Sequence, residues 1–182
     1  MLGETALDIN NAIINRFKLN SSDSKVLSST FDFFSKKQNW DNLLKFLSND
    51  SKISLRVIDY FLTTYCSQNK VEYNDLNVFI EYKNQLKKYH KKYFDPCSRG
   101  LKIPYFFNKD VCVITTICQI NFFKWFIQTK IFENFISLYQ DIKKSMKNKK
   151  LNRSKTNYSF NHNENNNVLY CSTSKNIMAL FD

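Results

Sequence analysis

Glycine and proline are almost absent from this chain of 182 residues, which contains two of each. Glycine supplies the positive-φ positions that tight hairpins require, so this scarcity disfavours a fold built from many β-hairpins. Two prolines leave long helices with few interruptions. The same scarcity excludes the glycine-rich loops that bind phosphate in P-loop and Rossmann proteins. The chain is therefore expected to be mainly α.

Apolar residues recur at helical spacing along most of the sequence. This spacing predicts helices over residues 5–19, 21–37, 40–47, 53–67, 75–94, 116–127 and 131–147. Between the helices predicted over residues 75–94 and 116–127, residues 103–107 and 111–114 could pair as one short β-ribbon. We expect a mainly α, single multi-helix domain over residues 1–148.

The composition changes after the last predicted helix. Residues 149–182 form a basic, Asn-rich segment with little apolar content between residues 151 and 167. Such a composition is typical of a flexible tail. The tail ends in a short apolar motif, Val168–Phe181, which either folds back on the domain or binds a protein partner.

Positive charge is concentrated in two short blocks. Residues 83–102 contain seven Lys or Arg and one acid, and residues 143–155 contain seven Lys or Arg and no acid. The whole chain has a net charge of +11. A clustered excess of this kind indicates a polyanionic partner.

The first block lies on the predicted helix 75–94, opposite a tyrosine-rich apolar face. Helical pitch places Lys83, Lys87 and Lys91 on one stripe, and acids that could pair with these lysines are nearly missing. Lysine is a point charge suited to phosphate and poorly suited to reading base edges. The predicted nucleic-acid-binding residues are Lys83, Lys87, Lys88, Lys91, Lys92, Arg99, Lys102, Lys143, Lys144, Lys147, Lys149 and Lys150.

Other interpretations of these features stay open. The lysine face could be an ordinary solvated helix surface, and the second block could be a nuclear-import signal or a solubilising end. Tyr82, Tyr89 and Tyr93 have core spacing, whereas Tyr105–Phe107 lies beside the first block, where base stacking is more plausible.

Catalytic and metal-binding patterns are not evident. Five cysteines form no CxxC pair and two histidines are isolated, so neither a zinc site nor a Cys/His or Ser/His/Asp arrangement can be assembled. We expect free thiols, no metal, no cofactor and no enzymatic activity. The first residues show no signal peptide, and no apolar run reaches the roughly 20 residues that span a bilayer, so no membrane partner is expected.

Four strings together resemble an uncharacterised protein family of nucleocytoplasmic large DNA viruses, the giant viruses. The strings are ISLR with DYF (residues 53–61), YKNQLK (82–87), FDPC (94–97) and TTICQINFFKW (115–125). The resemblance covers about residues 39–148. It implies an intracellular location in the host cytoplasm (virus factory), the host nucleus or the virion, and it implies no activity.

The sequence therefore predicts a non-enzymatic basic protein that binds DNA or RNA non-specifically, largely through phosphate contacts, and that is a viral factor. The alternative is a protein-interaction or virion scaffold protein whose basic blocks contact acidic partners.

Overall fold

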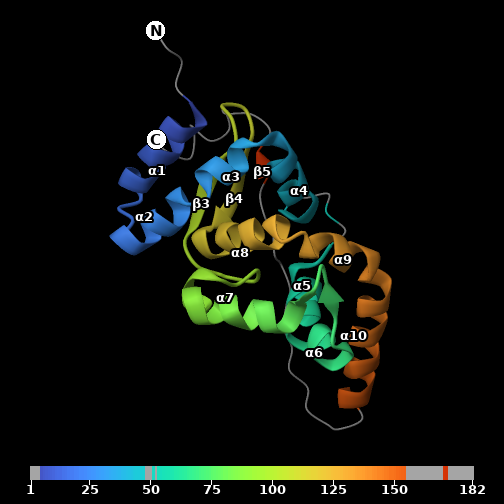
Figure 1. Cartoon of the computed structure of the whole chain (residues 1–182). Coiled ribbons are helices and arrows are strands. Elements are labelled where there is room, and N and C mark those ends of the chain that lie inside the picture. Colours follow the sequence, from blue (N-terminus) through green and yellow to red (C-terminus); the bar gives the residue numbers. More distant parts are fainter. Residues whose placement is uncertain (1–4, 48–50, 52, 155–169, 172–182) are drawn as a thin grey trace.

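The computed structural model describes residues 5–47, 51, 53–154 and 170–171, and this part of the chain is mainly helical, as predicted (Figure 1). The helical elements are α1 (Ala6–Arg16), α2 (Ser21–Ser28), α3 (Phe31–Ser35), α4 (Lys37–Leu47), α5 (Leu55–Tyr60), a π-helical turn (Phe61–Tyr65), α6 (Cys66–Asn69), α7 (Val78–Tyr93), α8 (Ile117–Gln128), α9 (Ile131–Ser137) and α10 (Tyr139–Ser154). The strands are β1 (Glu72–Tyr73), β2 (Leu76–Asn77), β3 (Lys102–Phe106), β4 (Cys112–Thr116) and β5 (Tyr170–Cys171).

The helix predicted over residues 21–37 is divided between α2, α3 and the start of α4. Asn20 caps α2 by accepting a hydrogen bond from the Asp23 backbone N–H. The break comes at Thr30, whose buried hydroxyl bonds to the Leu27 carbonyl at 2.6 Å and lies 2.9 Å from the Tyr105 hydroxyl. A local side-chain bond of this kind competes with the helical ladder.

A two-residue hairpin precedes α7 where the sequence predicts the start of that helix. Asn74 and Asp75 have φ values of 50° and 60° and connect β1 to β2. A tight hairpin needs positive φ at both central positions, and Asn and Asp tolerate it better than most residues. The helix therefore begins later than predicted, and Asn77 caps α7 by accepting a hydrogen bond from the Ile80 backbone N–H.

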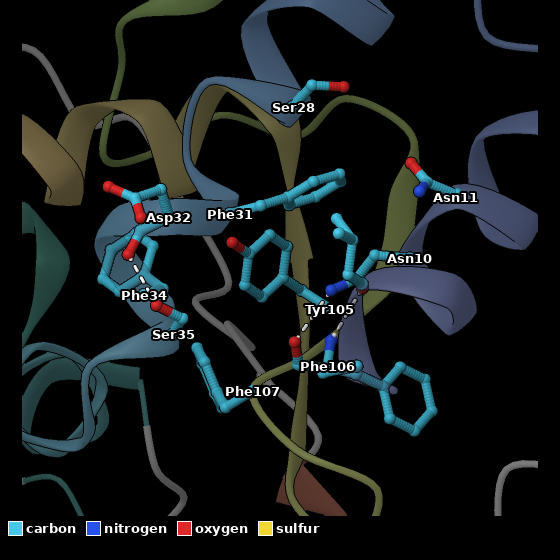
Figure 2. Close-up of a pocket in the computed structure, with 12 residues that line it drawn as sticks. Asn10, Asn11, Ser28, Phe31, Asp32, Phe34, Ser35, Tyr105, Phe106 and Phe107 are labelled. Carbon is cyan, nitrogen blue, oxygen red and sulfur yellow. Dashed lines mark hydrogen bonds between the residues drawn. The ribbon is translucent and has the colours of Figure 1, made fainter. Parts of the chain in front are cut away.

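The predicted β-ribbon forms as the antiparallel pair β3–β4, with Tyr105 opposite Val113. β3 is the outer strand of its sheet, so one edge of its backbone is not paired with another strand. Asn10 of α1 covers this edge: its amide donates to the Phe106 carbonyl at 2.8 Å, and its oxygen accepts from the Phe106 N–H at 3.0 Å (Figure 2). The Asn10 side chain thus replaces a neighbouring strand and protects the edge from pairing with another chain.

Helix α8 lies at the centre of the structure, between the β3–β4 ribbon and α7 (Figure 1). Thr116 caps it in a capping box with Gln119. Most of its residues are buried, and its aromatic side chains pack on one another and on rings from α4, α7 and α9. A helix that is apolar on most faces must be core. The fully buried rings in this core include Phe94, Phe122, Phe123, Phe126 and Phe135.

The C-terminal part differs from the prediction in two places. Helix α10 continues to Ser154, beyond the predicted end near residue 147. Within the predicted tail, β5 pairs with β4 in antiparallel register, with Tyr170 opposite Val113 and Cys171 opposite Cys112. Residues 155–169 and 172–182, which hold most of the predicted tail, lie outside the described residues.

Candidate nucleic-acid interface

Helix α7 carries the first basic block on its exposed side. Its apolar side packs against α8, where Val78 and Tyr82 are buried. The opposite side is solvent-facing, because the lysine side chains extend away from this packed surface. The exposed lysines are Lys83, Lys87, Lys88, Lys91 and Lys92.

These lysines have no carboxylate partner among the described residues. The ion pair found within 4.0 Å in that part of the chain joins Lys37 to Asp41, on α4. The α7 ammonium groups instead lie over aromatic rings of their own helix: Lys83 over Phe79 at 5.3 Å and Lys88 over Tyr89 at 5.0 Å. Cation–π contact at an exposed site contributes only about 0.5–1 kcal/mol and leaves the charge accessible. Five exposed positive charges are therefore available to an anionic partner.

The predicted single stripe through Lys91 is wrong, because α7 is kinked at His90. That residue has φ 55° and ψ 166°, a conformation that is unfavourable for any residue except glycine. Contacts from α8 hold the turn after the kink: the Cys118 thiol lies 3.4 Å from the Lys91 carbonyl, and the Asn121 amide donates to the Tyr93 carbonyl at 2.9 Å. Lys83 and Lys87 stay on the regular helix, and Lys91 lies beyond the kink.

Beyond the kink, the charge of Lys91 acts on Asp59 of α5. Burial, together with the nearby charge of Asp95, raises the pKa of Asp59 on α5. The positive charges of Lys91 and Arg56 oppose this shift and favour the ionised carboxylate. Lys91 is therefore within electrostatic range of Asp59, although it forms no ion pair with it shorter than 4.0 Å.

Arg56 also connects this region to the second basic block. A cavity of about 240 Å³ lies between α5, the π-helical turn and α10, and Arg56, Asp59 and Lys149 are among the residues that line it. Lys149 lies over the Tyr60 ring at 5.7 Å, and the Tyr60 hydroxyl is 3.0 Å from the Ser145 hydroxyl. Helices α5 and α6 lie between α7 and α10 (Figure 1), so the two blocks are joined through α5 and are not adjacent.

The remaining predicted residues are distributed over the loop after α7, the start of β3 and α10. Arg99 and Lys102 are exposed. On α10, Lys144 and Lys147 are exposed, whereas Lys143 is half-buried over the Tyr139 ring at 5.3 Å. The side chain of Lys150 lies outside the described residues. The structure therefore groups Lys83–Lys92 on α7 and Lys143–Lys149 on α10.

Two cations near the α7 lysines are absent from the predicted set. Arg56 lies near Lys149 because α10 packs against α5, a contact that the local sequence does not indicate. Lys124 of α8 donates to the Ser29 carbonyl, and its pKa is lowered by burial and by the nearby charge of Lys88. Lys124 has no sequence signal, because it is a single lysine in an apolar helix.

The prediction that Tyr105–Phe107 could stack on bases is wrong. These three side chains are 1%, 6% and 5% exposed, because the end of β3 and the residue after it pack against α1 and α3. Tyr105 and Phe107 pack on each other with ring centroids 5.4 Å apart.

The described cysteines are packing residues with weakly acidic thiols. Burial raises the pKa of Cys66 and of Cys97 to about 12, and that of Cys118 to about 11. A thiol with such a pKa is a poor nucleophile and a poor metal ligand at neutral pH. Among the described residues, no group of three or more His, Cys, Asp or Glu side chains could hold a metal ion. No helix in the described part of the chain is long and apolar enough to cross a membrane.

Comparison with known proteins extends the resemblance found in the sequence. The family model DUF7197, described as a family of unknown function, matches residues 4–181. An uncharacterized protein of Acanthamoeba polyphaga mimivirus is 34% identical over 164 residues, which cover 79% of this chain and 63% of the relative. The chain thus spans less than two thirds of that relative, and no solved structure matches this one. The predicted resemblance to an uncharacterised giant-virus family is confirmed, and the chain belongs to DUF7197, a protein family of unknown function.

Proposed function

We propose that this protein is a non-enzymatic viral factor that binds nucleic acid through phosphate contacts, without reading base sequence. The observation that carries the proposal is the row of exposed α7 lysines, which have no carboxylate partner among the described residues. Lysines held in such numbers on one short helix repel one another unless an anion lies nearby. A phosphate backbone supplies evenly spaced negative charge of this kind.

The type of residue supports phosphate recognition over base recognition. All five α7 cations are lysines, and lysine lacks the rigid fork with which arginine pairs to guanine. In this proposal Lys83, Lys87 and Lys88 contact the backbone first, and Arg56 and Lys149 extend the surface past the kink toward α10. Arg99, Lys102 and the exposed lysines of α10 add contacts at its margins.

Binding is tested with the full chain and fluorescently labelled duplex DNA, single-stranded DNA and RNA across a salt series. Phosphate-driven affinity falls linearly with log salt concentration, with a slope of about −0.9 per contact on duplex DNA. We expect tight binding at about 50 mM salt and a loss of at least tenfold by about 200 mM. If no nucleic acid binds at the lower concentration, the proposal is wrong and an acidic protein is the better candidate for this surface.

The same proposal locates the protein with viral nucleic acid, in the host cytoplasm at the virus factory, in the host nucleus or in the virion. Purification from infected cells with and without nuclease tests this. We expect viral nucleic acid to copurify and nuclease to remove any proteins bound through it. Copurified proteins that survive nuclease would favour a scaffold role.

A further inference from the structure

A second and larger cavity lies beside the β3–β4 ribbon. It has a volume of about 510 Å³ and lies between α1, α3 and the end of β3 (Figure 2). Its walls include Leu7, Phe31, Phe34, Tyr105 and Phe107. The Tyr105 hydroxyl is directed to Thr30, so the ring presents its apolar part to the cavity. The cavity therefore fits an apolar occupant.

The rim of this cavity leaves apolar surface uncovered. Leu7 on α1 is 51% exposed, one of the few large apolar side chains of the described residues that are so exposed, and Phe31 on α3 is half-buried. Both belong to well-defined helices, so their exposure does not come from irregular backbone. Apolar surface at the mouth of an apolar cavity indicates a site that is covered by something else.

The register of β5 brings the end of the chain to this place. β5 runs antiparallel to β4, with Cys171 opposite Cys112, and Cys112 is in turn opposite Phe106 on β3. The chain therefore leaves β5 at the end of the sheet where Phe106 and Phe107 line the cavity. Neighbouring strands are about 4.8 Å apart, so β5 and β3 are separated by about 10 Å.

The residues after β5 have the length and the composition to fill the cavity. An extended chain spans about 3.3–3.6 Å per residue, so the five residues 172–176 reach about 16–18 Å, farther than the distance from β5 to β3. The segment 177–181, Ile-Met-Ala-Leu-Phe, then follows with four large apolar side chains and no charge. The family match extends through residue 181, so this segment belongs to the region shared with the family.

We propose that the segment 177–181 binds in the cavity between α1, α3 and β3 of its own chain. Its apolar side chains cover Leu7 and Phe31, and β5 acts as the anchor that keeps the segment close at high effective concentration. The cavity is then an intramolecular docking site for the segment 177–181. This proposal is independent of nucleic-acid binding, since it uses none of the basic residues.

The test is hydrogen–deuterium exchange of the full chain, read at the amides of residues 177–181. Leu7→Glu places a charge at the rim of the cavity, and Ala12→Glu is its matched control, because Ala12 is exposed on the same helix and does not line the cavity. Docking predicts that exchange in the parent is at least about tenfold slower than in an unstructured peptide. Leu7→Glu should remove most of this protection, and Ala12→Glu should keep it.

A second variant keeps the test valid if Leu7→Glu does not fold. Phe181→Glu changes only the segment itself and should also abolish the protection of its neighbours, while α1 and β3 keep their native exchange. The proposal is overturned if the amides of residues 177–181 exchange freely in the parent. It is also overturned if these amides are equally protected in the Leu7→Glu and Ala12→Glu variants. Protection that rises with protein concentration would also overturn it, by assigning the cavity to the segment of a second copy.

Discussion

Asn10→Ala is expected to be among the most destabilising substitutions of a polar residue in this protein. Asn10 is 4% exposed, and its side chain makes both hydrogen bonds to the Phe106 backbone at the outer edge of β3. Alanine removes both bonds and leaves the Phe106 N–H and carbonyl without partners. An unsatisfied buried donor or acceptor costs about 1–3 kcal/mol. Both groups lie at an edge of the sheet, where relaxation of the backbone recovers part of this cost, so we expect the free energy of unfolding to fall by about 2–4 kcal/mol.

Urea denaturation followed by circular dichroism measures this loss. With a slope of about 1–3 kcal/mol per molar urea, the midpoint should fall by about 1–2 M. Asn11→Ala is the matched control, because Asn11 is the exposed neighbour on α1 and both substitutions gain the same helix propensity. If the two variants unfold within about 0.5 kcal/mol of each other, the edge-protecting role of Asn10 is refuted.

Three further predictions concern the thiols, a carboxylate and the first hairpin. Burial raises the pKa of Cys97 to about 12 and that of Cys118 to about 11, so at pH 8 their thiolate fractions are about 10⁻⁴ and 10⁻³. Iodoacetamide should therefore label these two thiols only after unfolding. Equal labelling of the native and the unfolded protein, measured by mass spectrometry, would contradict this. Burial raises the pKa of Asp59 in the folded state, so its contribution to stability is full below the unfolded pKa of about 3.9 and falls as pH rises through the folded pKa. Asp59→Asn should therefore be more stable than the parent at pH 7 and lose that advantage near pH 3, as urea midpoints at the two pH values will show; the reverse order would count against burial as the cause. Asp75→Val should be less stable than Asp75→Gly by about 1–2 kcal/mol in thermal unfolding, because φ is 60° at this position, and equal stability would exclude the turn conformation.

Local periodicity predicts most helices of this fold, because it depends on neighbours three and four residues apart. It predicts α1, α4, α8 and the exposed lysines of α7 in this way. It cannot predict the break at Thr30, because the Tyr105 hydroxyl that stabilises it comes from a residue 75 positions away. The β1–β2 hairpin is missed for a different reason: strands of two residues have no period to detect, and Asn-Asp is as typical of a helix cap as of a turn.

The candidate interface is predictable in its residues and unpredictable in its geometry. Sequence counting finds the α7 lysines and the scarcity of nearby acids. The kink at His90 depends on contacts from Cys118 and Asn121 on α8, so the position of Lys91 cannot follow from helical pitch. Arg56 joins the surface because α10 packs against α5, a long-range contact without a local signal.

The proposed function is tested most directly by the salt dependence of binding in Lys83→Gln/Lys87→Gln/Lys88→Gln. Its control, Lys36→Gln/Lys45→Gln/Lys109→Gln, loses the same charge from exposed lysines outside the surface.

Each phosphate contact contributes about 0.9 to the slope of log affinity against log salt on duplex DNA, so three lost contacts should reduce the slope by about 2.7. If parent and variant bind equally at about 1 M salt, this difference in slope corresponds at about 0.1 M salt to an affinity about 500-fold lower for the variant. The control should keep the parent slope. Equal slopes for the parent and the α7 variant would contradict phosphate binding by this helix.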